Sequence, residues 1–82
     1  MTFKETIKPF VLKNYLFSDD DSLLADDSPL ISGGIIDSTG ILELIEFIEA
    51  SYRIRVAAEE MVPANFESID AISTFLGRRV GG

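Results

Sequence analysis

The chain has 82 residues, fourteen acidic and seven basic side chains, and neither histidine nor cysteine. Its net charge of −7 repels nucleic-acid phosphates and anionic lipid, so it favours protein partners with basic surfaces. Without cysteine or histidine the chain lacks disulfides, thiolate metal sites, the common zinc ligands and the usual general base. A metalloenzyme or a triad hydrolase is therefore not expected.

The length fits a single domain over residues 1–82, which we expect to be monomeric. No apolar run approaches the roughly 18 to 20 residues of a membrane-spanning helix. Charged residues and Pro9 interrupt the first ten positions, so the start lacks the apolar core of a signal peptide. We therefore expect a cytoplasmic protein that neither inserts into membranes nor binds nucleic acid.

Apolar residues at steps of three and four predict a first helix over residues 3–16. Thr2 is its expected cap, and Pro9 predicts either a kink or a late start. Residues 18–37 are rich in aspartate, glycine and proline, which predicts a long loop. Four apolar residues are expected to hold this loop in order against the core: Leu23, Leu24, Leu30 and Ile31.

The clearest helical period in the chain lies over residues 38–52. Its expected core face comprises Ile41, Leu44, Ile45, Ile48 and Tyr52, and the opposite face comprises Thr39, Glu43, Glu46 and Ala50. Leu42 lies on the flank nearer Ser38, where either burial or contact with a partner is compatible with the pattern.

The remaining third of the chain predicts an extended connector and two helices. Residues 53–56 alternate polar and apolar, with Ile54 and Val56 expected inward, and a brief helix over residues 57–62 is expected to stop at Pro63. Ser68 is the expected cap of a last helix. Its expected buried face comprises Ile69, Ile72, Phe75, Leu76 and Val80.

These elements predict an all-α fold, a small four-helix bundle of three main helices and one short helix. A long ordered loop separates the first two helices. The terminal Gly81-Gly82 is expected to fray.

Ser38 is the candidate chemical handle. Asp37 and Ser38 are both favoured N-cap residues, so a role in capping alone remains open. The start of a helix also favours a bound anion such as a phosphodiester, and Gly33-Gly34 and Gly40 bracket the serine with positions that permit close approach.

Asp37-Ser38, preceded by Gly34-Ile35-Ile36 and followed by Leu42-Glu43-Leu44-Ile45, resembles the acyl carrier proteins and their peptidyl and D-alanyl carrier relatives. The order of helices and loop is similar over nearly the whole chain. The resemblance implies that Ser38 carries 4′-phosphopantetheine, transferred from coenzyme A by a phosphopantetheinyl transferase, with Asp37 as the flanking motif residue. It also implies a carrier of acyl or aminoacyl thioesters that is not itself an enzyme.

In this family the second helix docks onto basic partner surfaces, which implies recognition roles for Glu43 and Glu49. Other candidates for contact with partners are Thr39, Leu42, Glu46, Glu59 and Glu60. The implied partners are the enzyme that loads the acyl or aminoacyl group, a ligase or a transferase, and the downstream biosynthetic enzymes. The acyl chain of the family can fold back beside the second helix. Residues of this chain that could line such a cavity, though they are equally ordinary core, are Ile45, Ile48, Ile54, Met61 and Phe75.

Departures from the family pattern indicate a specialised carrier. Fatty-acid carriers usually have leucine and then an acidic residue after the serine, where this chain has Thr39 and Gly40, and Glu46 stands at a commonly apolar position. A polyketide, lipid-modifying or aminoacyl pathway is therefore favoured over housekeeping fatty-acid synthesis. The alternatives are an aminoacyl or peptidyl carrier loaded by an adenylating ligase, and an unmodified acidic helical interaction module.

The acidic run Asp19-Asp20-Asp21-Ser22 could suggest a calcium loop. Leu23 and Leu24 stand where an EF-hand requires a ligand and a glycine. No specific metal site is expected.

Overall fold

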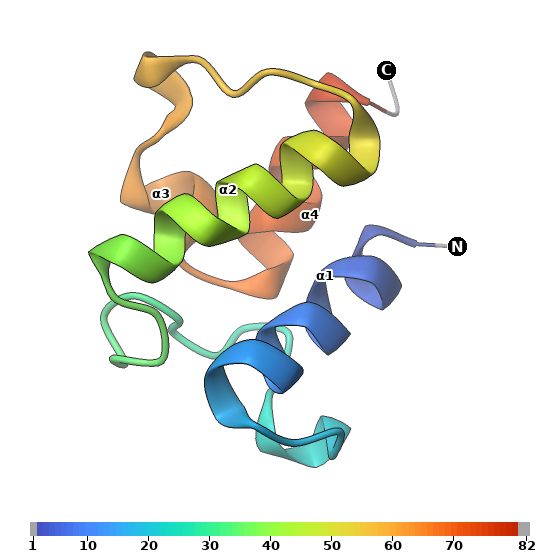
Figure 1. Cartoon of the computed structure of the whole chain (residues 1–82), viewed down its shortest axis with the longest axis vertical. Coiled ribbons are helices and arrows are strands. Elements are labelled where there is room, and N and C mark those ends of the chain that lie inside the picture. Colours follow the sequence, from blue (N-terminus) through green and yellow to red (C-terminus); the bar gives the residue numbers. More distant parts are fainter. Residues whose placement is uncertain (1, 81–82) are drawn as a thin grey trace.

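A computed structural model describes residues 2–80 of the chain. All regular elements in this part are helical, as expected, and Figure 1 shows α2 crossing the molecule in front of α3 and α4. The four α-helices are α1 (Phe3–Val11), α2 (Ser38–Tyr52), α3 (Pro63–Phe66) and α4 (Ile69–Arg79). Three shorter turns are the π-helix η1 (Leu12–Leu16) and the 3-10 helices η2 (Asp21–Leu23) and η3 (Ala58–Glu60). The expectation for Gly81-Gly82 falls outside the described residues.

The helices enclose one apolar core. α4 packs against both α1 and α3, and the buried face of α2 covers them. Fully buried side chains come from every α-helix and from the long loop: Ile7, Leu12, Leu24, Leu30, Ile36, Leu44, Ile48, Phe66, Ile69, Ile72, Phe75 and Leu76. This burial is the main stabilising contribution in so small a domain, because apolar transfer contributes about 25 cal/mol per Å².

The first helical run covers residues 3–16, as expected, in two parts. Thr2 Oγ1 accepts a hydrogen bond from the Glu5 N–H at 3.2 Å, which caps the start. The helix begins at Phe3 with Pro9 inside it, so the late start is excluded. The chain widens into the π-turn η1 directly after α1, and Phe17 ends it with a left-handed backbone, φ 53°.

The loop between α1 and α2 is ordered, but one of its four expected anchors is wrong. Leu24 and Leu30 are fully buried and Ile31 is partly buried, whereas Leu23 is 56% exposed. Asp20 Oδ1 accepts from the Ser22 N–H at 3.0 Å and caps η2. Because adjacent side chains on this turn point in different directions, only Leu24 reaches the core.

An ion-pair cluster ties the loop to the outer helices. Lys4 Nζ lies 3.2 Å from Asp26 Oδ2 and 2.7 Å from Asp70 Oδ1, and Lys8 Nζ lies 3.6 Å from Asp26 Oδ1. The Asp70 N–H also donates to the Asp26 carbonyl at 2.9 Å. The hydrogen bond from Lys4 is the main reason that the pKa of Asp26 lies below its ordinary value. The cluster thus fixes the loop against both α1 and α4.

Two expectations for the C-terminal third are corrected. The brief helix over residues 57–62 is the 3-10 turn η3, and Pro63 begins α3 instead of ending a helix. Proline suits the first position of a helix because its missing N–H would be unpaired there and its φ is already helical. Val80 is 41% exposed, because α4 ends at Arg79.

The remaining expectations for this part of the chain hold. The Ser68 side chain accepts from the Ala71 N–H and caps α4, as predicted. Val56 is buried and Ile54 is partly buried.

Within residues 2–80, no helix combines the length and the apolar character that crossing a bilayer requires.

Candidate functional site

Ser38 is the first residue of α2 and is exposed. The N-cap of α2 is Asp37, whose Oδ1 accepts from the Gly40 N–H at 2.7 Å. Since Asp37 performs the capping, the interpretation in which Ser38 serves only as the cap is wrong. The Ser38 hydroxyl stands instead just inside a fifteen-residue helix, where the helix dipole and unpaired backbone N–H groups favour an attached anion.

An apolar groove of about 420 Å³ opens beside Ser38. Asp37 and Ser38 form its polar edge. Its other lining residues come from the loop, from α2 and from the segment around α3: Ile31, Ile36, Ile41, Met61, Val62, Pro63 and Phe66. The site therefore combines an exposed hydroxyl with an apolar surface large enough for part of an alkyl chain.

The groove does not lie where the resemblance suggested. Of the five residues considered for a cavity, only Met61 lines the groove. Ile45, Ile48 and Phe75 are buried in the packed core, and Ile54 lies near the other end of α2. Interior side chains pack at nearly crystalline density, so these core residues leave no room for an acyl chain, and the groove opens instead at the surface between α2 and the α3 segment.

Tyr15 supports the start of α2, a role that the sequence did not reveal. Its hydroxyl donates to the Gly40 carbonyl at 2.9 Å. Burial first, and then the negative charges of Glu43 and Asp37, raise the pKa of this hydroxyl above its ordinary value. Tyr15 thus remains a hydrogen-bond donor at neutral pH and joins the end of the first helical run to the turn that carries Ser38.

Gly40, noted above as a departure from the family pattern, is required by this contact. A Cβ at Gly40 would lie 2.9 Å from Ile36 Cγ2 and 3.0 Å from Tyr15 Cε1. A glycine within an apolar helical period is a recognised sign of close approach, and it was the one sequence signal that could have indicated Tyr15 or Ile36.

We expect Gly40→Ala to destabilise the protein by about 1–3 kcal/mol, because the new methyl group overpacks the contact with Ile36 and Tyr15. The sign is the reverse of the usual effect, since alanine in a helix is favoured over glycine by about 0.5–1 kcal/mol. Gly77→Ala in α4 is the matched control, because its Cβ would meet only Phe3 Cε2, at 4.0 Å. Urea unfolding should show opposite shifts for the two variants, and a stabilised Gly40→Ala would contradict the assigned role.

The expected partner-facing residues of α2 have different surroundings. Thr39, Glu43 and Glu46 are exposed. Leu42 is 55% exposed, which excludes burial and leaves it accessible to a partner. Thr39 and Glu43 also line a polar hollow of about 310 Å³ with Asp37 and Tyr15. These side chains form an accessible surface around Ser38.

Three other acidic candidates lie farther along the chain. Glu49 is partly buried and its Oε2 accepts from the Val56 N–H at 2.9 Å, so it fixes the connector after α2. Glu60 accepts from the Ala57 N–H at 2.9 Å and pairs with Arg79, and these contacts, in that order, lower its pKa. Glu59 is exposed. Two of the three carboxylates therefore have structural contacts within the chain.

Glu67 holds the loop that leads to Ser38. Its carboxylate accepts from the Ile31 N–H at 3.2 Å, from the Ser32 N–H at 3.1 Å and from the Ser32 hydroxyl. Its own carbonyl accepts from the Leu30 N–H at 2.6 Å. Because Ile31 from the loop and Phe66 next to Glu67 both line the groove, these bonds join two of the segments that form it.

We expect Glu67→Gln to lower the urea midpoint near neutral pH, because a neutral amide accepts more weakly than a carboxylate. The hydrogen bond from the Ser32 side chain is the main reason that the pKa of Glu67 lies below its ordinary value. A depressed carboxyl pKa stabilises the fold above the unfolded pKa, and this contribution is lost as the pH falls through the folded pKa.

The midpoints of wild type and Glu67→Gln should therefore converge on acidification. Glu59→Gln, at an exposed position, removes the same charge and serves as the control. A difference between wild type and Glu67→Gln that stays constant with pH would exclude the carboxylate as the cause.

Within residues 2–80, no three acidic side chains gather closely enough to hold a metal ion.

No protein-family model matches the chain. A protein of Serratia sp. (strain ATCC 39006) named "Probable acyl carrier protein PigG" is 27% identical to it over 55 residues. The matched segment covers 67% of this chain and 63% of the relative, so the chain spans less than two thirds of that protein's length. This similarity agrees with the resemblance carried by Asp37-Ser38 and supports the acyl carrier family for this chain.

Proposed function

We propose that the protein is a non-catalytic carrier that holds an acyl group as a thioester on 4′-phosphopantetheine attached to Ser38. The observation that carries the proposal is the exposed Ser38 at the start of α2, whose cap is provided by Asp37. The serine hydroxyl is thereby left to form a phosphodiester. The similarity to a protein named as an acyl carrier supports the same conclusion.

The residues around Ser38 suit this group. Backbone N–H groups at the start of α2 favour the phosphodiester charge, and Gly34, with φ 77°, turns the chain before the serine. The prosthetic group would supply a thiol, which this cysteine-free chain lacks. The apolar groove along Ile36, Ile41 and Phe66 would shelter part of an apolar cargo from water.

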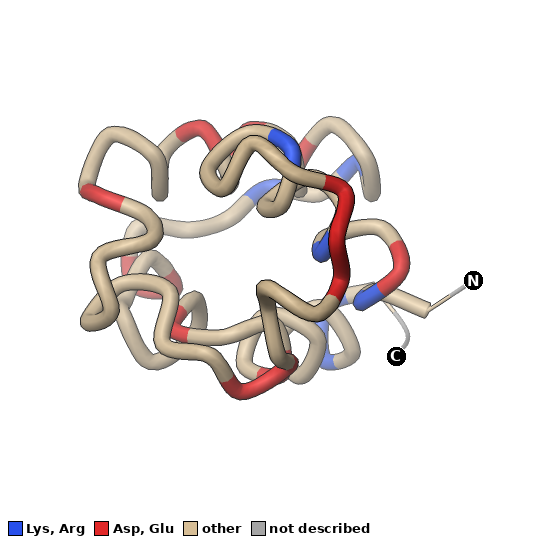
Figure 2. The backbone as a smooth tube through the Cα atoms, turned by 90° about the horizontal axis from the view of Figure 1, so that it is seen from below, with Lys and Arg blue, Asp and Glu red and all other residues tan. Residues whose placement is uncertain are grey.

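The exposed surface of α2 suits basic partners. Figure 2 shows Lys and Arg on the right-hand side of the described backbone, whereas the left-hand side carries only Asp and Glu among charged residues. Figure 1, which shares its horizontal axis, places the start of α2 on that acidic side. We propose that Thr39, Leu42, Glu43 and Glu46 contact the phosphopantetheinyl transferase and the enzymes that load or use the cargo.

Docking of this kind is weak and sensitive to salt. Each exposed ion pair contributes only about 0.2–1 kcal/mol, so several must act together. Glu49 and Glu60 already serve contacts within the chain, so we assign them a smaller share than Glu43 and Glu46. A specialised pathway, of which polyketide synthesis is one example, fits the departures at Thr39 and Gly40.

Incubation with coenzyme A and a broad-specificity phosphopantetheinyl transferase tests the proposal. Intact mass should increase by one phosphopantetheine, and peptide mapping should place it on the peptide containing Ser38. Because the chain has no cysteine, a thiol reagent should label the product and leave the untreated chain unlabelled. Absence of both the adduct and the thiol would favour the unmodified interaction module, and loading by an amino-acid-activating ligase would favour the aminoacyl carrier.

A further inference from the structure

Phe17 combines a strained backbone with an exposed aromatic side chain. Its backbone is left-handed, with φ 53° and ψ 42°, a conformation that favours glycine or asparagine and strains a bulky side chain. Its ring is 85% exposed, the largest exposure among the large apolar residues of the described chain. The folded domain gains neither relaxed backbone nor burial from this residue, and such departures concentrate at functional positions.

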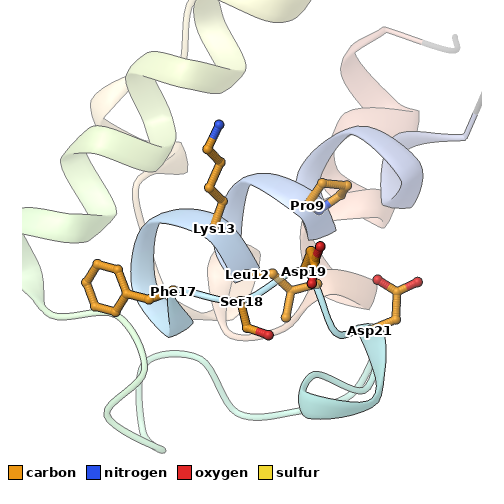
Figure 3. A pocket seen from close by; sticks show the side chains of 7 residues that line it. All are labelled: Pro9, Leu12, Lys13, Phe17, Ser18, Asp19 and Asp21. Atoms are coloured by element: carbon orange, nitrogen blue, oxygen red, sulfur yellow. The ribbon is translucent and has the colours of Figure 1, made fainter.

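Phe17 lines a hollow at the end of the first helical run, but it remains largely exposed. The hollow, of about 790 Å³, lies between the end of the first helical run and η2, lined by Pro9, Leu12, Lys13, Phe17, Ser18, Asp19 and Asp21. Figure 3 shows the Phe17 ring pointing away from Pro9 and Asp21, and the residue is largely exposed. The side chain is therefore presented outward, where another molecule could enclose it.

A hydrogen bond links the segment that ends in Phe17 to the start of α2. Tyr15, two residues before Phe17, donates its hydroxyl to the carbonyl of Gly40, which lies two residues after Ser38. This contact joins the end of the first helical run, which Phe17 follows, to the first turn of α2, which begins at Ser38. A protein that covers Ser38 from the side of the first helix therefore meets the Phe17 ring.

The charges near Phe17 are mostly acidic, with Lys13 as the one cation of the described chain that lines the same hollow. Asp19, Asp20 and Asp21 follow Phe17 in the chain and are all exposed. Within residues 2–80 none of these three carboxylates takes part in an ion pair with Lys or Arg. A partner that encloses the ring would satisfy them by placing Lys or Arg at the rim of an apolar pocket.

We propose that Phe17 is an anchor for the enzyme that attaches phosphopantetheine to Ser38, and that it inserts into an apolar pocket of that enzyme rimmed by basic residues. The inference rests on the proposed function. We assign the anchor to the transferase because its active site must reach the Ser38 oxygen itself. Enzymes that act later meet the cargo at the far end of the arm.

Steady-state loading kinetics of Phe17→Ala and Phe17→Gly test the proposal. Truncation of an enclosed aromatic anchor should raise KM for the carrier by about tenfold or more, while kcat stays within about twofold, because the ring binds without taking part in the reaction. Leu23→Ala removes another exposed apolar side chain from the same loop and should leave KM within about twofold. Phe17→Tyr, which keeps the ring, should retain most of the wild-type affinity.

Loading of the wild type and the KM of Phe17→Ala together distinguish failure of the proposed function from failure of the anchor role. If wild type takes up no phosphopantetheine, the proposed function and the anchor role both fail; if wild type is loaded and Phe17→Ala has an unchanged KM, only the anchor role fails. Thermal unfolding of both Phe17 variants should match wild type or, for Phe17→Gly, exceed it, because glycine adopts the left-handed backbone without strain. A loss of helix content or a lower Tm in both variants would make the ring structural. A wild-type dimer that Phe17→Ala dissociates, with loading unchanged, would assign the ring to self-association.

Discussion

The Ser38→Ala variant is expected to take up no phosphopantetheine under conditions in which wild type takes up one group per chain. A methyl group cannot form the phosphodiester, so the effect on loading is complete and not a partial change of rate. The fold should persist to within about 0.5 kcal/mol, because Ser38 is exposed and Asp37 provides the cap. Intact mass and thiol labelling measure the loading, and circular dichroism during urea unfolding measures the stability.

Ser51→Ala is the matched control, since Ser51 is exposed on the same helix but lies near its other end. This variant should gain one phosphopantetheine, as wild type does. An adduct on Ser38→Ala, or its loss from Ser51→Ala, would show that a different residue carries the group.

The Phe66→Ala variant is expected to lose about 3–5 kcal/mol of unfolding free energy. Phe66 is 1% exposed, and its ring centroid lies 5.4 Å from that of Phe75. Its removal leaves a cavity at the junction of the core and the groove. A chain of this length has a total stability of about 4–12 kcal/mol, so the loss removes a quarter or more of it and should lower the urea midpoint strongly.

Met61→Ala separates the loss of core packing from the widening of the groove. Met61 lines the same groove but is 42% exposed, so its truncation widens the groove with little loss of core packing. Urea midpoints should place Met61→Ala much closer to wild type than Phe66→Ala. Equal losses in the two variants would show that the groove, and not the core beneath it, determines the stability.

The helix that carries Ser38 was predicted from sequence with the observed bounds, residues 38–52. Asp37 is a favoured cap, the apolar period is regular, and the period ends where Arg53 adopts a left-handed backbone. These signals act within one or two helical turns, so neighbouring residues contain nearly all the information. Ser68 predicted the start of α4 for the same reason.

Predictions failed where a local signal has two meanings. Proline both ends helices and begins them, and the residues around Pro63 do not distinguish the two cases. Leu23 and Leu24 are identical neighbours, and only the direction of the η2 turn decides that Leu24 is buried. Val80 continued an apolar period beyond the point where its helix ends.

The groove and the hydrogen bonds that hold its surroundings depend on contacts between residues far apart in the chain. Tyr15 meets Gly40, and Glu67 meets Ser32, across 25 and 35 positions of sequence. Neither pair leaves a periodic pattern, because each bond depends on the packing of whole helices against each other.

The all-helical fold, the helix that begins at Ser38 and its acidic exposed face were therefore predictable from local sequence, since caps, periods and charges act over short distances. Folding decided which of Asp37 and Ser38 caps α2, where the apolar groove opens, and which glutamates stay accessible. Those features depend on the close packing of a small core, in which a few side chains from distant segments occupy the space and leave the rest at the surface.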